Sequence, residues 1–189
     1  LSMTIFVLLM LSTVTFDGFK ETPQWTALLG WGASEPSLNP LRLILHDIGL
    51  DFFDVFATVM LLLFPLIFFI VYMVTCLLAV ETTKCDRTYQ DIVGLFIYSL
   101  VPIAIAYHLA HYFSYLLVSG QFIIPLVSDP FGFGWNLFGT ANYSMNKGII
   151  GVKFVWYTAV IAIVVGHVFA VGVAHIVAIR AFKTRNLAL

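Results

Sequence analysis

VMLLLFPLIFFIVYMVTCLLAV, the stretch from Val59 to Val80, contains no charged residue. A membrane-spanning helix needs roughly 20 mostly apolar residues, so this stretch is long enough to cross a bilayer by itself. Pro65 lies inside it, and membrane helices tolerate such a proline as a kink. The whole chain of 189 residues is 61% hydrophobic and 10% charged, against about 45–50% and about 25% in average soluble domains. We therefore expect an integral membrane protein.

Apolar blocks along the chain predict the number of spans. There are four blocks, at Leu1–Phe16, Phe52–Val80, Ile92–Ser119 and Val152–Phe182. The first block is short for a span, and the chain opens without the basic segment and cleavage site of a signal peptide. We expect residues 1–189 to be a single transmembrane domain, in the C-terminal part of a longer protein. The predicted fold class is all-α, a polytopic transmembrane helical bundle of about four spans whose first span is short or truncated.

Positive charges predict the orientation of this bundle. Lys84 and Arg87 lie in the short loop between the second and third spans, and Arg180, Lys183 and Arg185 lie in or near the C-terminal tail. With four spans both segments are on one side, which the positive-inside rule assigns to the cytoplasm. The net charge of −1 and the lack of a basic run argue against a nucleic-acid partner. The expected partner is the lipid bilayer.

The two loops on the other side are unusual for linkers. In the loop Asp17–Leu50, Thr22-Pro23 and Asn39-Pro40 are typical of helix starts, and Trp25 and Trp31 suit a membrane interface. The loop Gln121–Ile150 is rich in aromatic residues, glycine and proline, with Asp129 as its one acidic residue. A free aqueous loop is seldom so apolar. We expect this loop to be ordered, and to lie in the membrane interface or fold back over the bundle.

Histidines inside the spans are the strongest signal for chemistry. His108 and His111 lie in the third span and His167 in the fourth, and ionisable groups within spans usually face the bundle interior or a cavity. Three residues apart, His108 and His111 share one helix face. At 1.5 Å per residue, His167 falls at a similar depth in the antiparallel fourth span. The pattern predicts a transition-metal site of these three histidines, with Asp129 as a further ligand; His175 lies two turns away.

Other interpretations of the histidines remain open. An intramembrane histidine can simply hydrogen-bond between helices. A haem b group would use His108 and His167 on opposite helices, with Gly166 and Gly172 giving room, but would leave His111 without a role. Imidazole ligands suit copper, zinc and iron alike, so the sequence does not choose the metal.

An acidic helix face precedes the second span. Asp47, Asp51 and Asp54 are spaced i, i+4, i+7 and follow His46. Acidic residues near a helix N-terminus interact favourably with the helix dipole and stay solvated. The alternative is a cation-attracting mouth above the histidines, to which Asp17 would add.

Several motifs together carry a resemblance to a known family. They are Phe16-Asp17-Gly18-Phe19 with Thr22-Pro23, Tyr107-His108-Leu109-Ala110-His111-Tyr112, Ser128-Asp129-Pro130-Phe131-Gly132 through Gly134-Trp135, Gly166-His167-Val168, and Ala174-His175. These motifs, which cover most of the chain, resemble a family of bacterial polytopic membrane proteins, many labelled fenitrothion hydrolase after an organophosphate-degrading activity. The resemblance implies a multi-pass protein of the bacterial inner membrane and a longer N-terminus. It also marks the histidines as part of the family's pattern.

Three functions fit these observations. The first is a membrane protein, or a subunit of a membrane complex, whose intramembrane histidines bind a transition metal (copper, zinc or iron). The second is a metal-assisted organophosphate-type hydrolase, in which a metal-bound water reacts and Asp129 acts beside the histidines. The third is a haem-bearing or structural subunit of a respiratory or oxidative complex. The motifs of soluble enzymes are absent from the sequence, which leaves open whether the protein is an enzyme.

Overall fold

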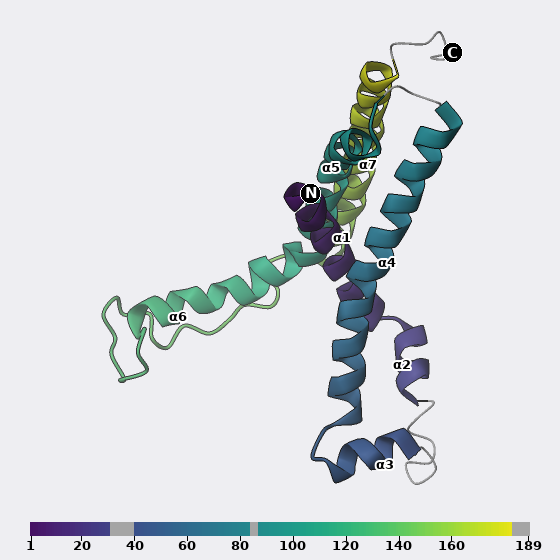
Figure 1. Ribbon diagram of the computed structural model, residues 1–189. Helices are drawn as coiled ribbons and strands as arrows, with labels where there is room; N and C mark the ends of the chain where they lie inside the picture. The colour runs from purple at the N-terminus through teal and green to yellow at the C-terminus, as the bar shows by residue number, and fades with distance from the viewer. Residues whose placement is uncertain (31–39, 84–86, 183–189) are drawn as a thin grey trace.

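Helices form all the regular structure in the described part of the chain, residues 1–30, 40–83 and 87–182 of the computed structural model (Figure 1). They are α1 (Ser2–Lys20), α2 (Pro23–Gly30), α3 (Pro40–Asp47), α4 (Phe52–Thr83), α5 (Tyr89–Ser119), the short 3-10 helix η1 (Gly120–Phe122), α6 (Ile123–Ser128) and α7 (Val152–Ala181). The predicted all-α class is confirmed.

Four of these helical segments are long and apolar enough to cross a membrane. They are Ser2–Lys20, Phe52–Thr83, the continuous run Tyr89–Ser128 through α5, η1 and α6, and Val152–Ala181. Each contains the apolar core of one predicted block. The first span was predicted to be short, and α1 extends it beyond Phe16 to Lys20. The chain is therefore a multi-pass membrane protein whose candidate spans, by length and composition, are α1, α4, α5 and α7.

Helix α5 is the central element of the bundle. It packs most extensively along α7, and α1 packs against both α4 and α5. The buried core lies between α1, α4 and α5, where Val7, Tyr72 and Ile97 are almost fully covered. By contrast, only 11% of the α4 span and 6% of the α7 span are buried within the chain. The apolar outer faces of α4 and α7 therefore suit lipid or other membrane-embedded protein.

The close contact of α5 with α7 depends on Gly166. A Cβ atom added there would lie nearer than 3.0 Å to the Cβ of Ala106 and 3.2 Å from the carbonyl oxygen of Pro102. Small residues at such points let membrane helices approach closely. A Cβ at Gly172 would meet nothing within 4 Å. Gly166 therefore lets α7 approach α5 closely, and room for a haem at Gly166 and Gly172 stays a prediction.

The short helix α2 closes one end of the α1–α4 pair. Its first turn is capped as predicted, since the Trp25 N–H donates to the Thr22 hydroxyl at 3.3 Å. Trp25 is buried, and its ring contacts Phe16 of α1 and Phe56 of α4 at centroid distances of 5.7 and 5.5 Å. Trp25 therefore joins three helices.

The predicted loop after α5 forms an arm with α6. Figure 1 shows a long helical rod, made of the end of α5, η1 and α6, projecting sideways from the other helices with the chain that follows it. The returning chain is held to the arm at Gln121, which accepts from the Tyr143 hydroxyl at 2.9 Å and from the Asn146 N–H at 3.0 Å. The arm is ordered, as predicted. It does not fold back over the bundle, and Phe131 and Phe133 are about 70% exposed.

Part of the predicted topology falls on residues outside the described ranges. These residues are Trp31, Asn39, Lys84, Cys85, Lys183 and Arg185. The cytoplasmic assignment of the charged loop and tail therefore stays a prediction.

Candidate functional site

A cavity of about 580 Å³ lies between the spanning helices. Its wall is mostly aliphatic and aromatic and comes from four elements: Leu11, Val14, Thr15 and Gly18 of α1, Phe68 of α4, Leu100, Ile103, Tyr107, Ala110 and His111 of α5, and Ala159 and Ile163 of α7. Small-molecule sites usually measure about 300–1,000 Å³ and are lined by apolar residues with a few placed polar groups. This cavity has the size and lining of such a site.

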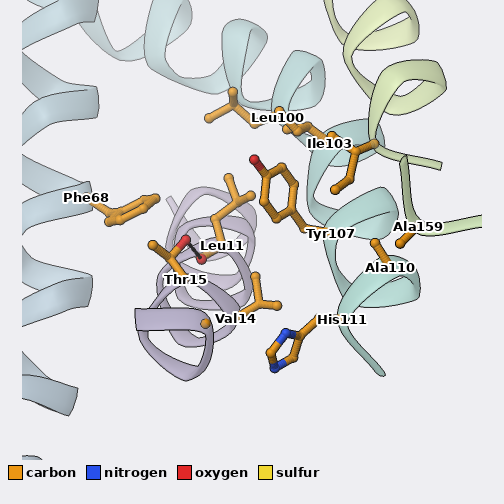
Figure 2. Close-up of a pocket in the computed structure, with 12 residues that line it drawn as sticks. Leu11, Val14, Thr15, Phe68, Leu100, Ile103, Tyr107, Ala110, His111 and Ala159 are labelled. Carbon is orange, nitrogen blue, oxygen red and sulfur yellow. Dashed lines mark hydrogen bonds between the residues drawn. The ribbon is translucent and has the colours of Figure 1, made fainter. Parts of the chain in front are cut away.

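Helix α5 supplies two of the three polar side chains that line the cavity. Tyr107 and His111 lie one helical turn apart, and Figure 2 shows both side chains directed toward α1, with Phe68 of α4 opposite. Within the described ranges neither the Tyr107 hydroxyl nor the His111 ring makes a hydrogen bond, whereas the Thr15 hydroxyl donates to the Leu11 carbonyl at 2.7 Å. Tyr107 and His111 are therefore the groups available to a bound molecule.

A polar network joins α1 to α5 beside this cavity. The Tyr112 hydroxyl donates a short hydrogen bond to Oδ2 of Asp17, whose other carboxylate oxygen lies 2.9 Å from the Lys20 ammonium. The His111 ring meets the Tyr112 ring edge-on at a centroid distance of 4.8 Å. Asp17 directly precedes Gly18, which lines the cavity. The network therefore fixes the position of α1 next to His111.

The histidines predicted to bind a metal occupy separate positions. His108 is half-buried, and its Nδ1 lies 2.9 Å from the carbonyl oxygen of Ala104 on the same helix. His167 is exposed, and its Nδ1 lies 2.8 Å from the Ile163 carbonyl oxygen. Its ring packs near Tyr107, at a centroid distance of 6.0 Å. His175, predicted to stand apart, is exposed further along α7.

No three His, Cys, Asp or Glu side chains of residues 1–30, 40–83 and 87–182 are gathered so that they could hold a metal ion. The predicted set of His108, His111, His167 and Asp129 is thus not brought into one coordination sphere. Sequence spacing gave the helix face and the depth, but the rotation of α7 about its own axis decides where His167 points. The metal site remains a prediction.

Asp129 has a local role in the arm. Its two carboxylate oxygens accept the backbone N–H groups of Phe133 and Gly134 at 2.9 and 2.8 Å. Both oxygens thus close the glycine-containing turn after α6, where Gly132 and Gly134 have positive φ. These two hydrogen bonds explain why the arm has an acidic residue at position 129, and the explanation requires no metal ion.

Replacing Asp129 with alanine should loosen this turn by about 1–2 kcal/mol, because two backbone donors lose a charged acceptor. That change corresponds to a roughly 5–30-fold faster opening. Hydrogen exchange at Phe133 and Gly134, measured in nanodiscs, checks it. Asn142→Ala, in the same arm, is the matched control and should leave exchange at both amides unchanged. Unaltered exchange in Asp129→Ala, combined with a loss of bound metal, would instead favour the predicted ligand role.

Of the three acidic residues before and at the start of α4, Asp51 caps the helix. Oδ1 of Asp51 accepts the backbone N–H groups of Phe53 and Asp54 at 2.7 and 3.3 Å, at the start of α4. Asp47 and Asp54 are exposed. These contacts favour the interpretation in which the acidic residues stabilise a solvated helix N-terminus.

The sequence reasoning missed the pairing of Asp17 with Tyr112. The signal was available in part, since Asp17 is the one acidic residue in the first span and Tyr112 ends the histidine-containing motif. The two residues are 95 positions apart in the sequence, and no local pattern indicates their contact.

The fold defines the class: this chain is a multi-pass membrane protein, with four helical segments in its described residues that are long and apolar enough to span a bilayer. No protein-family model, curated protein or solved structure matches it.

Proposed function

We propose that this protein binds a small lipophilic molecule in the cavity between α1, α4, α5 and α7. The observation that carries the proposal is the combination in one cavity of an apolar wall, a volume of about 580 Å³ and two polar groups, Tyr107 and His111, that make no hydrogen bond with any described residue. In a membrane an unpaired polar group costs free energy. A ligand with a polar head would satisfy both groups while its apolar body fills the rest of the cavity.

The polar pair indicates the chemistry of the head group. A tyrosine hydroxyl donates or accepts a hydrogen bond, and a neutral imidazole does both through its two nitrogens. The cavity wall is otherwise uncharged. The fitting ligand is therefore a neutral molecule with a carbonyl or hydroxyl head and a hydrocarbon body, the class that includes quinones.

Filling the cavity tests this proposal. The protein is placed in nanodiscs and titrated with decylbenzoquinone, a short-tailed quinone, by calorimetry. Ala110→Phe puts a ring into the cavity and should abolish saturable binding. The matched control is Leu109→Phe, since the neighbouring Leu109 is exposed and does not line the cavity. His111→Leu should weaken binding about two- to tenfold, the value of one hydrogen bond. Equal binding by Ala110→Phe and Leu109→Phe would refute the proposal.

A transition-metal or haem site at the histidines is the second proposal. One observation favours it. The Nδ1 atom of His108 and that of His167 each lie within hydrogen-bonding distance of a backbone carbonyl oxygen of the same helix. Metal-ligating histidines usually donate one ring N–H in this way, which leaves Nε2 as the ligand. Bound copper, zinc or iron would appear in elemental analysis of the purified protein, and haem b in its optical spectrum. His108→Ala and His167→Ala should then lose the group, whereas His175→Ala should keep it.

The remaining expectations are also proposals. Location in the bacterial inner membrane and organophosphate hydrolysis are supported by the resemblance to proteins labelled fenitrothion hydrolase. Turnover of an aryl phosphotriester by the purified protein tests the hydrolase activity. Association with other membrane subunits is supported by the small buried share of α4 and α7.

A further inference from the structure

The arm formed by α6 and the chain after it presents a cluster of aromatic side chains. Phe131, Phe133 and Trp135 contact one another at centroid distances of 5.4 to 6.0 Å. Their exposed fractions are 69%, 71% and 43%, and Phe138 nearby is 68% exposed. The arm tip is defined here as Phe131–Phe138. Its rings are packed on one another but not on the bundle.

Charge is almost absent from the arm. Residues 121–150 contain two charged side chains, Asp129 and Lys147. The Asp129 carboxylate is occupied by two backbone N–H groups of the tip. Lys147 follows Asn146, which is bonded to Gln121 at the base of the arm. The tip itself therefore has no charged side chain, and most of its surface is formed by apolar rings.

Five of the eight backbone N–H groups of the tip are bonded within the arm. Ser128 is fully buried, its carbonyl accepts from the Leu137 N–H, and its hydroxyl accepts from the N–H groups of Phe138 and Thr140. The N–H groups of Gly132, Phe133 and Gly134 donate to Asp129 at the base of the tip. Backbone donors left unpaired are costly near the hydrocarbon of a bilayer. A backbone with most of its N–H groups bonded, beneath exposed rings, is suited to a medium that supplies few hydrogen bonds.

From these observations we propose that the arm tip inserts into the interfacial region of the bilayer that the protein spans. The arm continues directly from a spanning helix, as part of the apolar run Tyr89–Ser128. Aromatic rings, tryptophan above all, are favoured at the level of the lipid head groups. A protein partner would normally be met with hydrogen bonds around an apolar centre, whereas five of the eight backbone N–H groups of the tip are already bonded within the arm. The occupant of this surface is therefore lipid.

Depth measurement by spin labelling tests the insertion. A nitroxide is attached at Phe133→Cys in a Cys76→Ala, Cys85→Ser background, and the protein is reconstituted in phosphatidylcholine nanodiscs. Collision with oxygen, which partitions into lipid, is compared with collision with a water-soluble nickel chelate. The aqueous reference is Glu21→Cys, at the exposed end of α1. The label at position 133 should show an oxygen-to-nickel ratio several-fold above that at position 21.

Two outcomes would overturn the proposal. Nickel accessibility at position 133 equal to that at position 21 places the tip in water. Exclusion of both reagents at position 133 places it under protein. Quenching of Trp135 by brominated lipid, taken as the difference between the wild type and Trp135→Phe, gives the same answer without cysteine variants: a quenched Trp135 supports insertion, and an unquenched one contradicts it.

Discussion

Replacing Gly166 with alanine should destabilise the protein by about 1–3 kcal/mol, the usual cost of overpacking a tight core. The new methyl group would overlap the side chain of Ala106 and press on the carbonyl of Pro102 at 3.2 Å. Neither neighbour can yield easily, because one is a methyl fixed to the backbone and the other is backbone itself. The helices α5 and α7 would have to move apart along their most extensive contact.

Two further variants separate this clash from the general effect of adding a methyl group. Gly172→Ala lies on the same helix with nothing within 4 Å of its new Cβ, so it should be neutral or stabilise by up to about 1 kcal/mol through helix propensity. Ala106→Gly should restore part of the stability lost by Gly166→Ala. Unfolding in mixed micelles gives the free energies. Similar values for the two glycine variants would show that α5 and α7 do not meet as described.

The spans were predictable because a bilayer imposes one simple requirement. Each span must be long and apolar, and Val59–Val80 meets that requirement without reference to any other residue. The cap at Thr22 was likewise predictable, since a cap involves only near neighbours. Both properties depend on short stretches of sequence, which is why the helices were expected close to where they lie.

The candidate site was harder to predict because it depends on how helices are rotated and crossed. The sequence placed His108, His111 and His167 at matching depth, yet one histidine lines the cavity while the other two lie near carbonyls of their own helices. Tyr107 entered the sequence analysis only as part of the histidine-containing motif. The aliphatic wall around Ala110 carries no motif, since apolar residues look alike whether they face lipid, a neighbouring helix or a cavity.

For the arm, the sequence predicted the kind of surroundings but not the direction of the chain. Its apolar composition indicated contact with something other than water, and the hydrogen bonds of Gln121 and Ser128 confirm that it is ordered. Composition could not tell whether the rings would cover the bundle or face outward. That choice depends on the direction in which the chain leaves α5, which no local pattern encodes.

Breaking the bond between Asp17 and Tyr112 should cost about 1–2 kcal/mol, because hydrogen bonds to a charged group exceed the average bond between membrane helices. Tyr112→Phe removes the donor and Asp17→Ala removes the acceptor, while the double variant removes both. If the bond joins α1 to α5, the double variant should lose less stability than the two single variants added together. The difference is the coupling energy of the two side chains. Unfolding in mixed micelles provides the four values that the cycle needs.

Lys20→Ala is the matched control for this cycle, since it removes the other partner of the same carboxylate. The Lys20–Asp17 ion pair is partly exposed, at 40% and 33% of the two side chains, and such pairs contribute about 0–1 kcal/mol. Lys20→Ala should therefore cost less than Tyr112→Phe. The network holds α1 beside His111, so Tyr112→Phe should also weaken decylbenzoquinone binding, although Tyr112 does not line the cavity. Additive single variants would mean that the two side chains do not interact, and that α1 is positioned by its apolar contacts alone.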